Sequence, residues 1–245
     1  MVRPFETLWD AESLQAEILE LFGEYDPLLW DLDAGTTWEF AQATDAAARR
    51  EFYRRTKGFV YQSCWNCATN DERSKYLAAL RVAAENNYLS ALDYGCGIGS
   101  GVVAFALAGL DRVIGADMNL PNLNFLKARL ARFDLTNAKI KDLYRSENFK
   151  DDTFDLVMCT EVLEHVEDPH ALGQKLADLT NPGGALVLSW SFVNMPTHLP
   201  QHFHLQAPHP DDLLTMGFGQ YMKEEVGLVF DGYTWFNNML WRKPA

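Results

Sequence analysis

The feature that most constrains this chain is a run of alternating glycines at positions 95, 97, 99 and 101. Residues 91–101 read ALDYGCGIGSG, so the glycines directly follow a short apolar stretch, and helical spacing continues over 100–109. Glycine permits a tight turn and lets a ligand approach the backbone closely. We therefore expect a strand, a glycine loop and a helix at the start of a parallel sheet.

The register of these glycines disfavours two common nucleotide-binding loops. A dinucleotide fingerprint, G-x-G-x-x-G, needs a last glycine where this chain has Ser100 or Val102. A P-loop needs Gly-Lys-Ser or Gly-Lys-Thr, which does not follow. Asp93 stands just ahead of the loop and would repel a pyrophosphate, but it suits a cation or a hydroxyl donor.

Two further acids end the next expected strands. Asp117 closes VIGAD, 20 residues after Gly97, which is the spacing at which a carboxylate accepts hydrogen bonds from ribose hydroxyls. Asp142 ends IKD, where a carboxylate suits an exocyclic amine. Together with Asp93, these acids predict a nucleoside site without a phosphate, for a ligand with adenine, ribose and a positive centre.

From residue 89 onward, short apolar runs alternate with helical segments, which predicts an α/β fold with a doubly wound, Rossmann-like sheet. The expected strands are 89–94, 112–117, 138–143, 154–160, 184–191, 227–233 and 234–241. The expected helices are 100–109, 120–133, 168–179 and 209–219. Only Asp231, Gly232 and Tyr233 separate the last two strands, so we expect a hairpin there and an antiparallel last strand.

The chain before residue 86 shows helical spacing and no convincing strand. Leu14, Ile18 and Leu21 recur at helical steps, and further helices are expected from Thr44 and over 71–86. We therefore divide the chain into an N-terminal helical cap, 1–86, and a sheet domain, 87–245. Aromatic residues are dense in the cap, either as its core or as rings that face a ligand.

These motifs together resemble the class I S-adenosylmethionine-dependent methyltransferases over residues 89–241. The resemblance implies a seven-stranded sheet with an antiparallel last strand, and a protein that methylates a small molecule with S-adenosyl-L-methionine and releases S-adenosyl-L-homocysteine. It also implies that the glycine loop holds the amino-acid end of the cofactor, Asp117 the ribose, and Asp142 with Leu143 the adenine. The full set of expected cofactor-binding residues is Asp93, Gly95, Gly97, Gly99, Asp117, Met118, Asp142, Leu143 and Glu161.

Four histidines fall within residues 198–209, in a segment similar to a His-containing loop of small-molecule methyltransferases. The loop follows an expected strand at the carboxyl edge of the sheet, where open α/β sheets bind ligands. We expect His202 or His204 to accept a proton from the acceptor or to orient it, because imidazole titrates near neutral pH. Metal binding and ordinary packing stay open as alternatives.

Two other groups suit structural roles better than chemistry. Cys64 and Cys67 have CxxC spacing, but a zinc site needs two more ligands and no second CxxC exists. Glu164 and His165 follow the fourth expected strand and suit a bracing role in its loop. We therefore predict no metal site.

The composition limits the kinds of partner that this chain is expected to bind. The chain has 34 acidic and 21 basic residues, a net charge of -13, which disfavours binding to a phosphate backbone. No apolar run approaches the length of a membrane span, and no apolar signal segment is evident, so we expect a cytoplasmic protein with a small-molecule substrate. Two other functions remain open: a non-catalytic binding or partner subunit of the same fold, and a nucleotide-dependent oxidoreductase.

Overall fold

A single sheet of seven strands organises the computed structural model, which describes residues 8–26, 43, 45–69, 72–150, 152–190, 217–235 and 238–245. The strand order is β3-β2-β1-β4-β5-β7-β6. The strands are β1 (Ser90–Tyr94), β2 (Arg112–Asp117), β3 (Ala138–Asp142), β4 (Phe154–Thr160), β5 (Thr180–Ser189), β6 (Val229–Trp235) and β7 (Asn238–Arg242). The predicted α/β fold is confirmed, since β7 runs antiparallel to both β5 and β6 and the other pairs are parallel.

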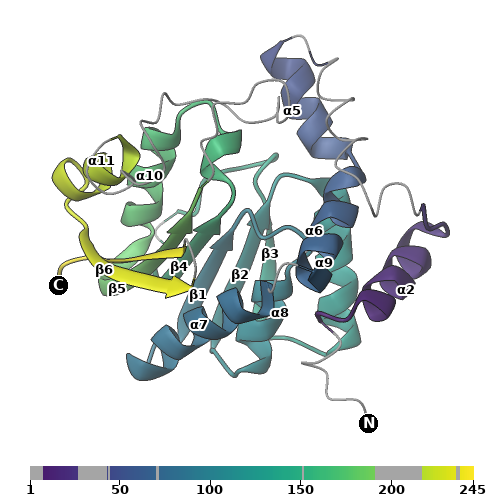
Figure 1. Cartoon of the computed structure of the whole chain (residues 1–245), viewed down its shortest axis with the longest axis horizontal. Coiled ribbons are helices and arrows are strands. Elements are labelled where there is room, and N and C mark those ends of the chain that lie inside the picture. The colour runs from purple at the N-terminus through teal and green to yellow at the C-terminus, as the bar shows by residue number, and fades with distance from the viewer. Residues whose placement is uncertain are drawn as a thin grey trace.

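Helices cover both faces of the sheet (Figure 1). The described α-helices are α2 (Ala11–Phe22), α5 (Ala46–Arg55), α6 (Gly58–Thr69), α7 (Glu72–Glu85), α8 (Ser100–Leu107), α9 (Leu120–Arg132), α10 (Pro169–Asp178) and α11 (Phe218–Glu224). In β4, Leu156 packs into the apolar cluster that includes α8, whereas Val157 packs into the cluster that includes α10. This alternation buries the strand on both faces, as expected for a parallel sheet. None of these helices is both long and apolar enough to cross a membrane.

The predicted position of the last hairpin turn is wrong. Strand β6 continues through Gly232 to Trp235, and the chain returns as β7 from Asn238. The register of the β6–β7 pair shifts between Phe230 and Gly232, and Gly232 has a φ of 104°. Gly232 therefore lies at an irregularity within β6, where glycine is tolerated, and not in the turn.

The expected helices before residue 86 are present, but the sequence did not reveal α6. Its buried residues, Val60, Tyr61, Cys64 and Cys67, lie on one side of the helix. The residues between them include Gln62, which faces a cavity, so the helix lacks a simple contrast of apolar and solvent-exposed faces. The expected helix over 209–219 begins at Phe218 in the described chain, and residues 209–216 lie outside the described residues.

The N-terminal helices share their apolar core with the sheet. Ile18 of α2, Val60 of α6 and Ala79 of α7 belong to the same buried cluster as Val113 of β2 and Leu156 of β4. A boundary between a cap and a sheet domain near residue 86 stays a prediction. What the packing shows is that the helices and this face of the sheet bury apolar surface together.

A buried ion pair joins α2 to α9. Arg129 of α9 and Glu17 of α2 are 1% and 6% exposed, and Nε of Arg129 lies 2.7 Å from Oε2 of Glu17. The same guanidinium donates to Oγ of Ser100, at the first turn of α8, at 2.9 Å. One arginine therefore joins three helices. Its buried charge depends on Glu17, whose other carboxylate oxygen also pairs with Arg132 at 2.7 Å.

We expect Glu17→Gln to lower the free energy of unfolding by about 3–5 kcal/mol, since it leaves the charge of Arg129 buried without its carboxylate. Glu20 of the same helix is the matched control, because its side chain is 72% exposed although it pairs with Arg132. Glu20→Gln should cost less than about 1 kcal/mol. Urea unfolding of both variants measures the difference, and equal losses would contradict the assigned role of the buried pair.

Candidate functional site

The glycine loop has the backbone that its sequence predicts. Gly95, Gly97 and Gly99 have φ values of 75°, 53° and 76°, in the left-handed region that favours glycine. Space is also limiting, since a Cβ on Gly95 would lie 2.2 Å from the Val162 side chain and one on Gly99 2.3 Å from Leu126. The loop therefore turns tightly and lies directly against α9 and the segment that follows β4.

The carboxylate of Asp117 holds this loop in place. Its Oδ2 accepts from the backbone N–H of Gly97 at 2.8 Å, and its Oδ1 accepts from the N–H of Asn119 at 2.7 Å. Burial raises the pKa of Asp117 to about 6, although the backbone hydrogen bonds act in the opposite direction. A buried carboxylate at the end of β2 thus joins the glycine loop to the start of α9.

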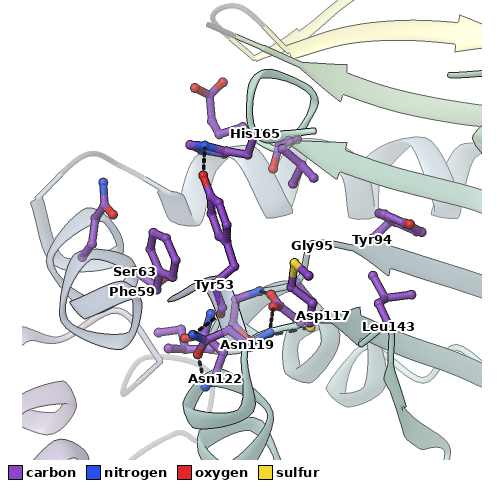
Figure 2. Close-up of a pocket in the computed structure, with 18 of the residues that line it drawn as sticks. Tyr53, Phe59, Ser63, Tyr94, Gly95, Asp117, Asn119, Asn122, Leu143 and His165 are labelled. Atoms are coloured by element: carbon purple, nitrogen blue, oxygen red, sulfur yellow. Dashed lines mark hydrogen bonds between the residues drawn. The ribbon is translucent and has the colours of Figure 1, made fainter. Parts of the chain in front are cut away.

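Asn119 carries this connection to the N-terminal helices. Its Nδ2 donates to the backbone oxygens of Tyr53 and Thr56, at 2.8 and 2.9 Å, where α5 gives way to α6. Its Oδ1 accepts from the N–H of Asn122 and caps α9. The chain around Tyr53 and the end of β2 are therefore held by one side chain (Figure 2).

A cavity of about 550 Å³ opens beside these groups. Its volume lies within the range of small-molecule sites. Six expected cofactor-binding residues line it: Gly95, Gly97, Asp117, Met118, Leu143 and Glu161. The remaining three, Asp93, Gly99 and Asp142, do not.

Asp142 is held by α5 at the edge of the site. Both of its carboxylate oxygens accept from Arg54, at 2.9 and 3.0 Å, and Arg54 also donates to the backbone oxygen of Met118 at 2.9 Å. The Arg54 side chain is only 9% exposed. The next residue, Leu143, supplies the cavity wall. An adenine bound here would thus meet Leu143 and Met118, with Asp142 and Arg54 behind them.

Asp93 lies behind the glycine loop, at the end of β1. It is 3% exposed, and its Oδ2 lies 2.6 Å from the position that a Cβ on Gly101 would occupy. The Asp93 carboxyl therefore lies against the first turn of α8.

The N-terminal helices contribute an aromatic wall. The ring of Tyr53 stacks on Phe59, with ring centres 5.2 Å apart and an angle of 13° between the planes. Its hydroxyl lies 3.1 Å from Nδ1 of His165, so Tyr53 extends from the level of Asn119 to the loop after β4 (Figure 2). Burial raises the pKa of Tyr53 above its usual range, which keeps the phenol neutral. Tyr61 of α6 is buried in the core instead of lining the cavity.

Glu161 stands at the end of β4 with a φ of 54°, an unusual value for a residue with a side chain. Its Oε1 accepts from Oγ of Ser189 at 2.7 Å, and its N–H donates to the backbone oxygen of Ser189. These bonds connect the ends of β4 and β5 at the carboxyl edge of the sheet. Backbone strain retained at such an edge is common at ligand sites.

The other candidates have different outcomes. Cys64 and Cys67 are buried in α6, and Sγ of Cys67 lies 3.3 Å from Oγ of Ser100. Within the described ranges, no three His, Cys, Asp or Glu side chains form a group that could hold a metal ion. His202 and His204 lie outside the described residues, so their role stays a prediction.

Sequence reasoning missed the part of the wall that α6 and α7 provide. The cavity residues from these helices include Gln62, Ser63, Asn66 and Lys75. The spacing of Val60, Cys64 and Cys67 was the available signal for α6, since it repeats every three or four residues. No pattern of that kind distinguishes a cavity lysine from a surface lysine.

Comparison with known proteins agrees with this geometry. Residues 92–188 match the family model of the methyltransferase domain, a segment that includes the glycine loop, Asp117, Asp142 and Glu161. Residues 92–188 therefore belong to the methyltransferase domain family. The enzymes of this family use S-adenosylmethionine as methyl donor, so the family match supports the nucleoside site predicted from the strand-end acids.

Individual relatives are similar to part of this chain. It is 36% identical over 128 residues to the ubiquinone biosynthesis O-methyltransferase of Xanthomonas campestris pv. campestris (strain B100), a match that covers 50% of each chain. The chain thus spans about half the length of the curated relatives it matches.

Solved structures share the fold of this chain. An O-methyltransferase family protein from Burkholderia thailandensis has a TM-score of 0.58 and 14% identity, with 84% of this chain and 63% of that chain covered. An S-adenosylmethionine-dependent methyltransferase from Clostridium acetobutylicum ATCC 824 has a TM-score of 0.54 and 12% identity, with 71% and 93% covered. At these identities the likeness supports the fold alone.

We expect Arg54→Met to loosen α5, because one guanidinium supplies both hydrogen bonds to Asp142 and the bond to Met118. Amide hydrogen exchange in α5 should become about tenfold faster or more. Arg55→Met is the matched control, since Arg55 is 78% exposed and pairs only with Glu51 among the described ion pairs. Unchanged exchange in Arg54→Met would show that this contact does not hold the helix.

Proposed function

We propose that this methyltransferase binds S-adenosyl-L-methionine in the cavity beside Asp117 and methylates a hydroxyl group of a small organic acceptor. The observation that carries the proposal is the buried carboxylate of Asp117, held between the glycine loop and α9 on the cavity wall. Such a carboxylate is an acceptor for hydroxyl donors, and the ribose of a nucleoside provides two of them.

The residues of the cavity and the glycine loop fit each part of S-adenosylmethionine. Asp117 would accept from the ribose hydroxyls, and Met118 with Leu143 would contact the adenine. The left-handed glycines at 95 and 97 keep the backbone accessible to the amino-acid end, and the buried Asp93 carboxyl lies behind the loop. When bound, S-adenosylmethionine supplies a methyl group activated by its positively charged sulfur.

The acceptor would bind between α5, α6 and the loop after β4. Tyr53, Phe59 and Val162 provide apolar surface there, and Gln62 and Asn66 provide amides. These walls would orient the acceptor in line with the methyl group and exclude water, which accounts for most of the work in such a transfer. Transfer to oxygen is supported by the printed names of the relatives, which are O-methyltransferases.

The decisive experiment measures ligand binding first and turnover second. Calorimetry should show binding of S-adenosylmethionine and S-adenosylhomocysteine and none of NAD. A labelled methyl donor should then transfer its label to members of a panel of small phenols and catechols, but not to the corresponding methyl ethers. Binding of NAD without S-adenosylhomocysteine would overturn the proposal in favour of an oxidoreductase. Cofactor binding with transfer only to amines would overturn the hydroxyl assignment.

Affinity for S-adenosylhomocysteine should fall with pH below about 6. In the free protein the pKa of Asp117 is raised to about 6, and a protonated carboxyl cannot accept from both ribose hydroxyls. Affinity should be constant above pH 7 and about tenfold weaker at pH 5, because ligand and proton compete for the same group. Asp117→Asn should bind weakly with no such dependence. A flat wild-type profile between pH 5 and 8, measured by calorimetry, would remove Asp117 from the ribose site.

We also propose that His202 or His204 accepts the acceptor's proton, a role derived from the position of their loop after the fifth expected strand. The rate should rise with pH through the histidine range, near 6.5. Replacement of the active histidine by Asn should lower turnover about 100-fold and keep affinity for S-adenosylhomocysteine. Full turnover in both single variants, with or without a chelator, would show that the histidines have no chemical role.

A further inference from the structure

The carboxylate of Asp142 already has a full set of partners from the protein. A carboxylate offers about four lone-pair positions, two on each oxygen. At Oδ1 these are met by Nη1 of Arg54 at 2.9 Å and by the backbone N–H of Tyr144 at 3.1 Å. At Oδ2 they are met by Nη2 of Arg54 at 3.0 Å and by Nε of Arg145 at 3.3 Å. These contacts therefore fill the carboxylate before any donor group of a ligand reaches it.

The backbone that follows Asp142 is engaged in the same way. The N–H of Leu143 donates to the backbone oxygen of Asp117 at 2.9 Å, and the backbone oxygen of Tyr144 accepts from Arg50 at 3.1 Å. Of Asp142, Leu143 and Tyr144, only Leu143 lines the cavity. The end of β3 therefore presents an apolar side chain to a ligand, whereas these polar groups are bound to other parts of the protein.

The pair between Arg54 and Asp142 is costly to open. The two side chains are 9% and 20% exposed, so both charges are largely shielded from water. Two parallel N–H···O bonds join the planar groups, which is a strong geometry for such a pair. Arg54 also donates to the backbone oxygen of Met118, and its guanidinium lies 4.8 Å from the centre of the Tyr144 ring. A ligand amine that displaced Arg54 would leave a buried guanidinium without its carboxylate, so we expect the pair to persist when the ligand binds.

These contacts affect how the purine of the methyl donor is recognised. If the adenine lies against Leu143 and Met118, its 6-amino group is a hydrogen-bond donor near a carboxylate whose positions are filled. Glu147, in the loop after β3, does line the cavity, but it pairs with Lys175 at 2.8 Å and its side chain is 57% exposed. Water competes for such an exposed group, so its contribution is small. The purine would therefore be held through its ring faces, which adenine and hypoxanthine share.

We propose that the donor site does not distinguish adenine from hypoxanthine, an inference that rests on the proposed function. The resemblance to class I methyltransferases implies instead that Asp142 holds the adenine, and a site built around such a bond rejects a purine that lacks the amino group. In this chain Asp142 is a positioning residue, because it holds Arg54, and with it α5, at the end of β3. S-inosyl-L-methionine, which has oxygen at position 6 of the purine, should therefore bind as S-adenosyl-L-methionine does.

The test compares two ligands that differ only at position 6 of the purine. Calorimetry near neutral pH measures the affinities of S-adenosylhomocysteine and of S-inosylhomocysteine, in which oxygen replaces the amino group. A hydrogen bond from the amino group to a carboxylate would be worth about tenfold or more in affinity. The two affinities of the wild type should therefore differ by less than about tenfold. A larger difference would overturn the inference, although binding of S-adenosylhomocysteine alone would still support the proposed function.

Asp142→Asn separates recognition of the purine from positioning of α5. The substitution removes the charge that pairs with Arg54, so amide exchange in α5 should become about tenfold faster or more. The ratio of the two affinities should stay within about threefold of the wild-type ratio, because neither ligand loses a bond of its own. Asp142→Ser repeats both measurements if Asp142→Asn does not fold.

Asp152→Asn is the matched control. Asp152 pairs with Arg112 in an exposed ion pair outside the described cavity wall, so this variant should match the wild type in affinities and in exchange. A selective loss of affinity for S-adenosylhomocysteine in Asp142→Asn would restore the adenine role and overturn the inference. Unchanged exchange in α5 would also overturn it, since Asp142 would then not position the helix. A wild type that binds neither ligand overturns the proposed function and this inference with it.

Discussion

One buried carboxylate organises the site and much of what surrounds it. Asp117 ends β2, receives the N–H of Gly97 and the N–H of Asn119, and so fixes both the glycine loop and the first turn of α9. Because it is desolvated, its pKa rises to about 6, which means that the folded protein holds an ionised group there at a cost in stability above that pH. A hydroxyl-rich ligand would reduce this cost by donating to the same oxygens.

The N-terminal helices are held in place by the residues around Asp117, and they complete the wall of the cavity. Asn119 binds the backbone between α5 and α6, and Arg54 of α5 binds the carboxylate at the end of β3. At the opposite end of this helical layer, the buried pair of Arg129 and Glu17 holds α2. These contacts are polar, directional and largely shielded from water, so they specify one placement of the helices more sharply than apolar packing alone would.

A structural feature could be predicted from the sequence where the residues that produce it are close together in the chain. The glycine loop, Asp117 and the order of strands were predictable, because strand, loop and helix follow one another within a few residues and glycine has few substitutes at positive φ. The Arg54–Asp142 pair was not, because 88 residues separate its members and only tertiary packing brings them together. Gly232 was misread as part of a turn for a related reason: an isolated glycine marks a bulge as readily as a hairpin, and only the register of β7 distinguishes them.

The division of the cavity limits what relatives can say about the acceptor. In the proposed site, the donor half is built by strand ends and the glycine loop, all of which fall within residues 92–188, the segment that matches the methyltransferase domain. Much of the acceptor half comes from α5 and α6, which precede that segment and present Tyr53, Phe59 and Gln62 to the cavity. Acceptor selectivity depends on the side chains that contact the acceptor, and the same domain accommodates many acceptors by changing them. The substrate named for a relative therefore applies to this chain only as far as these helices agree, whereas the proposed donor site lies within the matched segment.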